Sequence, residues 1–241
     1  MVASRQTIVA APRQRPLARE PDPDCSFCPR LATFRGSLRT TQPEWHNAPV
    51  PAFGSLDARL LVVGLAPGLR GANRTGRPFT GDFAGDLLYE TLIEFGFAAG
   101  AYGASVGDGL RLVSCVITNA VRCVPPQNKP MPSEIENCRP FLAATIAALP
   151  DLCAIVALGR IAHGSIVRAF GLKPAAFPFL HGAEHVLVAG ETAVNRNNAV
   201  TRAITLIDSY HCSRYNTNTG VLTQDMFRTV FAKARENLQC P

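Results

Sequence analysis

Four cysteines of this chain are spaced as in protein metal centres. Cys25 and Cys28 form a Cys-x-x-Cys pair; 94 residues then lead to Cys123, and 14 more separate it from Cys138. Four thiolates suit either a zinc ion or an iron-sulfur cluster, and spacing alone does not distinguish the two. Because the chain has eight cysteines, an accidental grouping of buried thiols is a third interpretation. The other four are Cys115, Cys153, Cys212 and Cys240.

A glycine-rich segment, residues 64–82, is a second place where the chain could act on a ligand. Glycines let the backbone approach a ligand closely and offer unhindered N–H donors. The segment contains neither Gly-Lys-Ser/Thr nor Gly-x-Gly-x-x-Gly, which disfavours nucleotide hydrolysis and dinucleotide binding. Near its end lie Phe79 and Asp82. Taken alone, these would be a core aromatic after a proline and the N-cap of a helix starting near Phe83, and Asp86 is a rival carboxylate one turn later.

Polar residues also follow two apolar runs elsewhere in the chain. Asn119 ends one run, where its amide could pair with a ligand edge or could stabilise the turn over residues 120–126. His211 follows the other run and is a candidate proton donor or hydrogen-bond donor. Asp82, Asn119 and His211 can act together only if the fold brings them to one place.

The apolar and helical patterns predict the elements that position these residues. Short apolar runs alternate with helical segments, which is typical of a parallel sheet covered by helices on both faces. The expected strands are Leu60–Gly64, Leu112–Thr118, Leu152–Leu158 and Ile204–Asp208, with an extra strand at His185–Ala189. The expected helices span about 84–96, 134–149, 160–171 and 223–238. The predicted fold class is α/β, a three-layer α/β/α arrangement with a central, mainly parallel four-stranded sheet.

Such a sheet also predicts where a ligand binds. In open α/β sheets the ligand lies beyond the carboxyl ends of the strands. The segments that follow the four expected strands are 64–68, 118–119, 159–160 and 209–211. They contain the polar residues singled out above, so we expect a site at this edge.

Length and composition fit one domain with a full hydrophobic core. The chain has 241 residues, 47% of them hydrophobic, and a formal net charge of +6. Its excess of arginine suits contacts with nucleic-acid phosphates, although a solvated surface would have the same composition. Residues 1–24 are predicted to form a flexible basic arm before a single domain at 25–241. Because no apolar run reaches roughly 18 residues and no signal-peptide pattern occurs, we expect a cytoplasmic protein with reduced thiols and no membrane association.

Three segments together resemble the uracil-DNA glycosylase superfamily: residues 64–82, 118–123 and 209–211. The resemblance extends over about residues 25–235 and is to family 5, also called UDGb, because Leu65 stands where family 4 carries Glu. It implies the α/β fold of that superfamily. It also implies removal of uracil, and of other deaminated or damaged bases, from DNA by hydrolysis in base excision repair.

The resemblance gives the candidate residues specific roles. The base must be flipped out of the duplex, because its reactive bond is inaccessible in the stack. Phe79 would stack on the flipped base, and Asn119 would pair with the N3–H and O4 of uracil. Asp82 would orient or activate water and stabilise the oxocarbenium-like sugar, while His211 would donate a hydrogen bond to the departing uracil anion. The other expected base-binding residues are Leu65, Ala66 and Gly68.

The resemblance also implies a metal centre and a DNA-binding face. The four-cysteine pattern looks like the [4Fe-4S] cluster of families 4 and 5, with zinc as the less favoured alternative. Its expected ligands are Cys25, Cys28, Cys123 and Cys138. The expected DNA-binding residues are Arg74, Arg77, Arg122, Arg160, Ser213, Arg214 and Tyr215. One residue departs from the family pattern: Cys212 replaces the proline of His-Pro-Ser, which removes a rigid residue beside His211.

Two alternatives to a hydrolytic glycosylase stay open at this point. A non-catalytic iron-sulfur protein on the same fold would bind DNA or carry electrons, and it would release no free base. A relative of family 4 with a nucleophilic His211 would form a covalent adduct with DNA, although the Lys- and Arg-rich insertion of that variant is missing before His211. For the glycosylase we expect DNA containing uracil or related damaged bases as the partner, and a monomeric protein.

Overall fold

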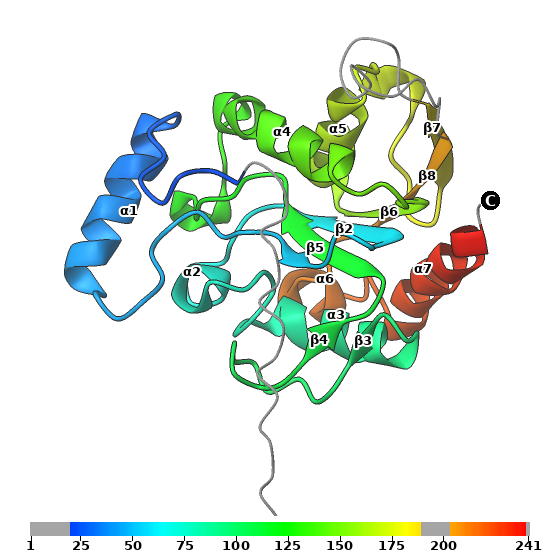
Figure 1. Ribbon diagram of the computed structural model, residues 1–241, viewed down its shortest axis with the longest axis horizontal. Helices are drawn as coiled ribbons and strands as arrows, with labels where there is room; N and C mark the ends of the chain where they lie inside the picture. Colours follow the sequence, from blue (N-terminus) through cyan, green and yellow to red (C-terminus); the bar gives the residue numbers. More distant parts are fainter. Residues whose placement is uncertain (1–19, 189–202, 240–241) are drawn as a thin grey trace, which may run out of the picture.

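The centre of the molecule is a six-stranded sheet (Figure 1). The computed structural model describes residues 20–188 and 203–239, and within them the strand order is β1-β5-β2-β6-β8-β7. Strands β5, β2, β6 and β8 are parallel, and β1 and β7 pair antiparallel at the two edges. The bounds are Phe53–Gly54 (β1), Leu60–Gly64 (β2), Cys115–Asn119 (β5), Ala154–Leu158 (β6), Glu184–Val188 (β7) and Ala203–Ser209 (β8).

The fold class predicted from the sequence is confirmed, and two edge strands extend the four parallel ones. Each parallel strand lies within three residues of the apolar run that predicted it. The extra strand predicted at His185–Ala189 is β7, and Ala189 itself lies outside the described residues. Strand β1 was not predicted, because two residues are too short to show an alternating pattern.

Helices cover both faces of the sheet and form the outer layers. Helices α4 and α5 lie on one face, and α3 and α7 lie on the other (Figure 1). The helices are α1 (Pro29–Thr41), α2 (Ala72–Thr75), α3 (Phe83–Glu94), α4 (Pro132–Ala147), α5 (Arg160–Ala169), α6 (Arg214–Asn218) and α7 (Gln224–Glu236). A small ribbon of β3 (Ala98–Ala99) and β4 (Arg111–Leu112) lies apart from the main sheet. No helix in the described part of the chain combines the length and apolarity needed to cross a membrane.

Strand β2 shows how side-chain alternation builds the two halves of the core. Successive strand residues point to opposite faces of a sheet. Leu60 and Val62 pack in the cluster that contains α3 and α7, while Leu61 and Val63 pack in the cluster that contains α4 and α5. All four are fully buried, and burial of each such side chain contributes about 1.5–3 kcal/mol. This packing fixes the end of β2 and hence the start of the glycine-rich segment.

Strand register brings the predicted site segments to one edge of the sheet. Gly64 at the end of β2 pairs with Asn119 at the end of β5. Leu158 at the end of β6 pairs with Ser209 at the end of β8, two residues before His211. The carboxyl ends of the parallel strands therefore meet where the sequence predicted a ligand.

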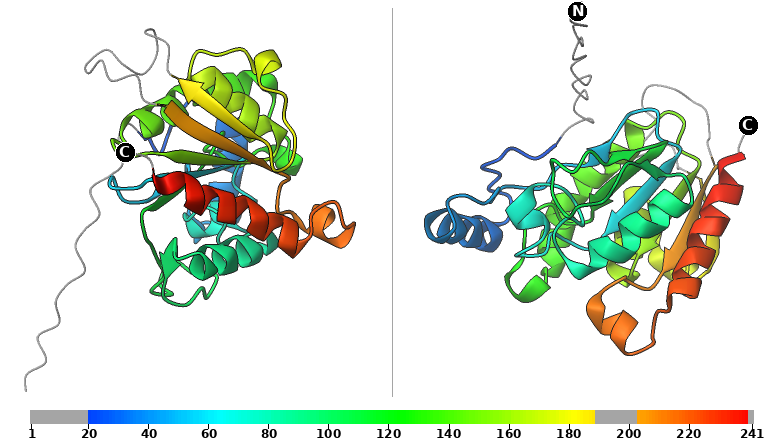
Figure 2. Two further views of the ribbon diagram at one scale, coloured as in Figure 1. Left: turned by 90° about the vertical axis from the view of Figure 1, so that its right-hand side faces the viewer. Right: turned by 90° about the horizontal axis from the view of Figure 1, so that it is seen from below.

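The N-terminal boundary predicted from the sequence is wrong for its last residues. Residues 1–19 lie outside the described part, but Glu20 accepts from the backbone N–H of Ala52 at 3.1 Å and forms an ion pair with Arg122. Asp24 pairs with Arg39 of α1. Residues 20–24 therefore belong to the folded domain. The helix that follows, α1, lies at the opposite end of the molecule from α7 (Figure 2).

Candidate active site

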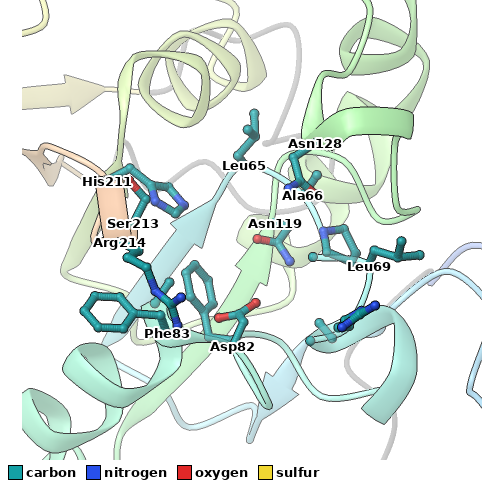
Figure 3. A pocket seen from close by; sticks show the side chains of 17 residues that line it. Leu65, Ala66, Leu69, Asp82, Phe83, Asn119, Asn128, His211, Ser213 and Arg214 are labelled. Atoms are coloured by element: carbon teal, nitrogen blue, oxygen red, sulfur yellow. The ribbon is translucent and has the colours of Figure 1, made fainter. Parts of the chain in front are cut away.

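A cavity of about 640 Å³ opens at the carboxyl edge of the sheet, beside the ends of β2, β5 and β8 (Figure 3). It gathers residues from the glycine-rich segment, the start of α3 and the loop after β8. The predicted residues that line it are Leu65, Ala66, Gly68, Phe79, Asp82, Asn119, His211, Ser213 and Arg214. Lining residues that the sequence did not single out include Leu69, Phe83 and Asn128.

Asn119 presents an unpaired amide oxygen to the cavity. Its side chain is 3% exposed, and its Oδ1 has no hydrogen-bond partner among the described residues. Gly64 makes this position possible, because a Cβ there would lie 2.4 Å from Asn119 Oδ1 and 2.4 Å from the ring of Phe79. A buried amide without a partner is costly unless a ligand supplies one. The arrangement therefore favours a ligand that donates a hydrogen bond to Asn119.

Asp82 caps a helix and faces the cavity at the same time. Its Oδ1 accepts from the backbone N–H of Gly85 at 3.2 Å, which is the N-cap role suggested by the sequence. Its Oδ2 lies so close to Gly68 and Gly71 that a Cβ would meet it at 2.8 and 2.3 Å respectively. Burial raises the pKa of Asp82. In Figure 3 this carboxylate points toward Asn119, whereas the rival Asp86 is exposed and does not line the cavity.

Phe79 is held in an unusual backbone conformation with its ring against the cavity. Its φ is +53°, in the left-handed region that non-glycine residues rarely adopt. Its ring stacks beside that of His211, with centroids 6.1 Å apart and planes at 28°. Two tyrosines that the sequence did not single out hold the backbone here: Tyr102 Oη donates to the Phe79 carbonyl at 3.2 Å and Tyr89 Oη donates to the Pro78 carbonyl at 2.7 Å. Both tyrosines are therefore positioning residues for the Phe79 ring, which forms the aromatic wall of the cavity.

His211 lines the cavity with an uncharged imidazole. Burial lowers its pKa to about 4, so the imidazole is uncharged at neutral pH. Asn216 Nδ2 donates to the His211 carbonyl at 2.8 Å. The neighbouring Cys212 is fully buried, and its Sγ donates to the Ala84 carbonyl at 3.5 Å. These contacts restrain the turn at the position where the family pattern has proline.

Comparisons with known proteins agree with this geometry. The profile of the family described as "Uracil DNA glycosylase superfamily" matches residues 51–235. The chain belongs to the uracil-DNA glycosylase superfamily. It is 43% identical over 217 residues to the "Type-5 uracil-DNA glycosylase" of Thermus thermophilus, which covers 88% of this chain and 92% of that relative. It is 36% identical over 221 residues to that of Pyrobaculum aerophilum, covering 90% of each chain.

Similarity to the type-4 branch of the superfamily is shorter. The "Type-4 uracil-DNA glycosylase" of Archaeoglobus fulgidus is 39% identical over 126 residues, which is 52% of this chain and 55% of that relative. The likeness to type-5 members therefore extends over far more of the sequence. The resemblance to family 5 stated from the sequence is confirmed.

The predicted DNA-binding arginines of this superfamily member divide into exposed and buried residues. Arg74, Arg160 and Arg214 are exposed, as is Tyr215, whose exposed fraction is 73%. Arg214 lies over the ring of Phe83 at the cavity mouth. Ser213 instead caps α6 by accepting from the backbone N–H of Asn216 at 3.4 Å, although it also lines the cavity.

Two of the predicted DNA contacts are wrong. Arg77 is 3% exposed, and its Nη1 and Nη2 donate to both carboxylate oxygens of Asp108 at 2.9 and 2.6 Å. Arg122 is 1% exposed and donates to Thr145 Oγ1 at 2.8 Å, besides its ion pair with Glu20. Because their guanidinium groups are buried and already paired, neither can reach a phosphate.

The four predicted metal ligands line one small cavity next to α1. Cys25, Cys28, Cys123 and Cys138 all contribute to its wall. N–H groups face three of the sulfurs: the Arg122 backbone donates to Cys138 Sγ at 3.2 Å, Arg35 Nη1 to Cys123 Sγ at 3.6 Å and Asn137 Nδ2 to Cys28 Sγ at 3.8 Å. Such donors stabilise negative charge on cysteine ligands. The chemistry of this donor set fits a cationic metal centre.

Proposed function

We propose that this chain is a monofunctional DNA glycosylase that hydrolyses the N-glycosidic bond of uracil, and of related deaminated or damaged bases, to leave an abasic site. The observation that carries the proposal is the convergence of Asp82, Asn119 and His211 on one cavity (Figure 3), which Phe79 also lines. The type-5 relatives support uracil as the base removed. The partner is DNA that contains such a base.

The base pocket combines a stacking surface with a reading group. The flipped base lies against the Phe79 ring, whose position the two tyrosines fix. The unpaired Oδ1 of Asn119 accepts the N3–H of uracil, and its amide N–H donates to O4. Cytosine has no N3–H and carries an amino group at the O4 position, so the same amide discriminates against it.

Asp82 and His211 act on the two products of bond cleavage. As the bond between C1′ and the base breaks, positive charge grows on the sugar and negative charge on the base. The Asp82 carboxylate stabilises the sugar cation and orients the water that adds to C1′. The water proton passes to solvent or to the released base. The neutral His211 imidazole donates a hydrogen bond to the departing anion and need not transfer its proton.

The DNA-binding face consists of the exposed residues around the cavity mouth. Arg74, Arg160 and Arg214 are available to contact phosphates on either side of the flipped nucleotide. Tyr215 projects from α6 and is suited to fill the gap that the flipped base leaves in the duplex. Nothing in this assignment requires the buried Arg77 or Arg122.

We propose that the four cysteines hold a [4Fe-4S] cluster. Around one zinc ion, with Zn–S bonds near 2.3 Å, sulfur atoms lie about 3.8 Å apart. Within the described residues, no three of these sulfurs lie within 4.8 Å of one another, although all four line one cavity. A multinuclear cluster suits this wider spacing. Its role is structural, joining the segment before α1 to α4; a brown protein with iron and visible absorption would support it, and a colourless zinc protein would contradict it.

A single-turnover assay on uracil-containing DNA tests the proposed activity. Alkali-labile abasic sites should form, and Asp82→Asn and Asn119→Ala should each lower the rate by about 10²–10³-fold. Asp86→Asn is the matched control, because this acidic residue of the same helix is exposed and lies outside the cavity; its rate should stay near that of the parent.

The two alternatives give different results in the same assay. A non-catalytic DNA-binding or redox protein would bind uracil-containing DNA with a salt-dependent affinity and release no base. A nucleophilic His211 would leave a shifted protein band on a denaturing gel. Either result in place of free uracil would contradict the proposal.

A further inference from the structure

Two histidines and an aspartate from three elements meet at the far side of the sheet from β1. His163 comes from α5, His185 from β7 and Asp208 from β8, which lie together at one edge (Figure 1). His163 Nδ1 lies 2.7 Å from Asp208 Oδ1, and His185 Nε2 lies 3.4 Å from Asp208 Oδ2. One ligand atom of each lies within 4.8 Å of the other two. The group shares no residue with the base pocket or the cysteine centre.

The hydrogen bonds of His163 leave its second ring nitrogen facing a carboxylate. His163 Nε2 lies 2.8 Å from the carbonyl of Phe177, which can only accept, so Nε2 must carry the hydrogen. The other ring nitrogen faces the carboxylate of Asp208, which is also an acceptor when ionised. A lone pair on Nδ1 would be repelled by that carboxylate. A hydrogen on His163 or on Asp208 must therefore lie between them, unless a metal ion takes its place.

His185 supplies a further candidate ligand atom. Its Nε2 is buried and makes no hydrogen bond within the described residues, although Asp208 Oδ2 lies 3.4 Å away. Its ring packs edge-on against Phe177 and His163, with centroids 5.8 and 5.6 Å apart. His163 and Asp208 are 2% and 0% exposed, so the group is largely dry. Burial of an unpaired nitrogen in such a place is costly unless it has a ligand.

We propose that His163, His185 and Asp208 bind a divalent transition-metal ion of the zinc type. Two imidazoles and a carboxylate are a donor set that zinc prefers, and a metal-bound histidine typically donates its second N–H to a carbonyl, as His163 does to Phe177. Ligand atoms around tetrahedral zinc lie about 3.3 Å apart, so shifts of roughly an ångström complete the site. The ion would join α5, β7 and β8. Its ligand Asp208 lies three residues before His211 in the sequence.

Zinc binding to the purified holoprotein tests this site without any measure of glycosylase activity. The iron-loaded protein is dialysed against zinc, and bound zinc is counted by mass spectrometry. We expect one zinc per chain in the parent and none above background in His185→Gln. At about 100 times the dissociation constant, zinc should raise Tm by about 5–10 °C in the parent only.

A second histidine variant controls for non-specific binding. His46→Gln alters an exposed histidine that lies outside the group, so it should bind zinc as the parent does. An anomalous peak at the zinc edge, between His163, His185 and Asp208 in soaked crystals, would locate the ion. Equal zinc content and equal Tm shifts in the parent and His185→Gln would overturn the proposal. A shared hydrogen, and not a metal ion, would then join His163 to Asp208.

Discussion

Polar groups are paired differently in the base pocket and in the shell behind Phe79. The shell consists of Arg77, Asp108, Tyr89 and Tyr102. In the pocket, Asn119 has an unpaired oxygen, and Asp82 uses one oxygen as a cap and turns the other toward the cavity. In the shell, Arg77 and Asp108 form a bidentate pair, and the tyrosine hydroxyls both donate to backbone carbonyls. The difference indicates that a fully paired shell stabilises a pocket whose own pairing is left for the ligand.

Breaking the ion pair of the shell should have the largest effect on stability. Arg77 holds the pKa of Asp108 well below its usual range. Arg77→Met leaves the largely buried Asp108 carboxylate with no opposite charge and with only the backbone N–H donors of Gly103 and Leu110, so it should lower the free energy of unfolding by about 3 kcal/mol. Urea unfolding at pH 7 measures this change.

A double variant distinguishes loss of the pair from loss of packing. Arg77→Met combined with Asp108→Leu removes both charges, so it should recover part of the lost stability. If the double variant is as unstable as the sum of the single variants, the ion pair is not what stabilises the shell. The stack of Arg77 on Tyr89 and Tyr102 would then be the main contribution.

A fall in pH should lower the stability of the folded protein through His211 in the pocket. Because His211 has its pKa lowered to about 4 in the folded protein, the unfolded chain binds more protons between about pH 4 and 6.5. The free energy of unfolding is therefore undiminished by His211 above pH 6.5, and protonation of this residue in the unfolded chain lowers it by about 3 kcal/mol as the pH approaches 4. His211→Gln should lose this dependence, so the difference between the two unfolding curves isolates it.

Asp82 changes the free energy of unfolding with pH in the opposite direction to His211. Its effect must therefore be separated from that of His211 in the unfolding measurement. Its raised pKa means that the folded state favours the protonated carboxyl, so its contribution is present at low pH and lost as the pH rises through the raised pKa. The residue is common to the parent and to His211→Gln and therefore cancels in their difference. A parent that loses no more stability than His211→Gln on acidification would contradict a buried, neutral imidazole.

The sequence predicted the residues of the base pocket but not the shell of residues behind Phe79. The parallel strands were predictable because their apolar runs are buried on both faces. Asn119 and Asp82 were predictable as well, because Asn119 ends strand β5 and Asp82 is the N-cap of α3. Arg77 was mistaken for a surface residue because its partner Asp108 lies 31 residues away in the sequence. Tyr89 and Tyr102 carry no signal in the sequence, since only the folded chain brings their hydroxyls to the Phe79 turn.

Helix α1 and the group at His163 illustrate the same limit. Helix α1 buries only Leu31, Arg35 and Leu38, so its sequence lacks the apolar stripe that predicts a helix. Its position depends on contacts such as that of Arg35 with the carbonyl of Cys25 at 2.9 Å. His163 gave no local signal either, because Asp208 is 45 residues away.

Closing the space around Asp82 should disturb the pocket without changing any charge. In Gly71→Ala the new Cβ would lie 2.3 Å from Asp82 Oδ2, so the carboxylate must move. We expect the single-turnover rate on uracil-containing DNA to fall by about 10²-fold, because charge stabilisation depends on placement. Gly107→Ala is the control, since no atom lies within 4 Å of its Cβ. Equal rates for both variants would mean that Asp82 does not act from its present position.

The smallest expected effect comes from a single hydroxyl that links the two regions. Tyr102→Phe removes the donor to the strained Phe79 carbonyl and the acceptor of the Gly81 N–H at 3.3 Å, while the ring still stacks on Tyr89. Loss of these bonds should lower the free energy of unfolding by about 1 kcal/mol. If Tyr102 positions the aromatic wall, kcat should fall several-fold with little change in KM, because the wall is then misplaced in the transition state more than in the bound state. A loss of stability with unchanged kcat would show that the shell supports the fold but not the pocket.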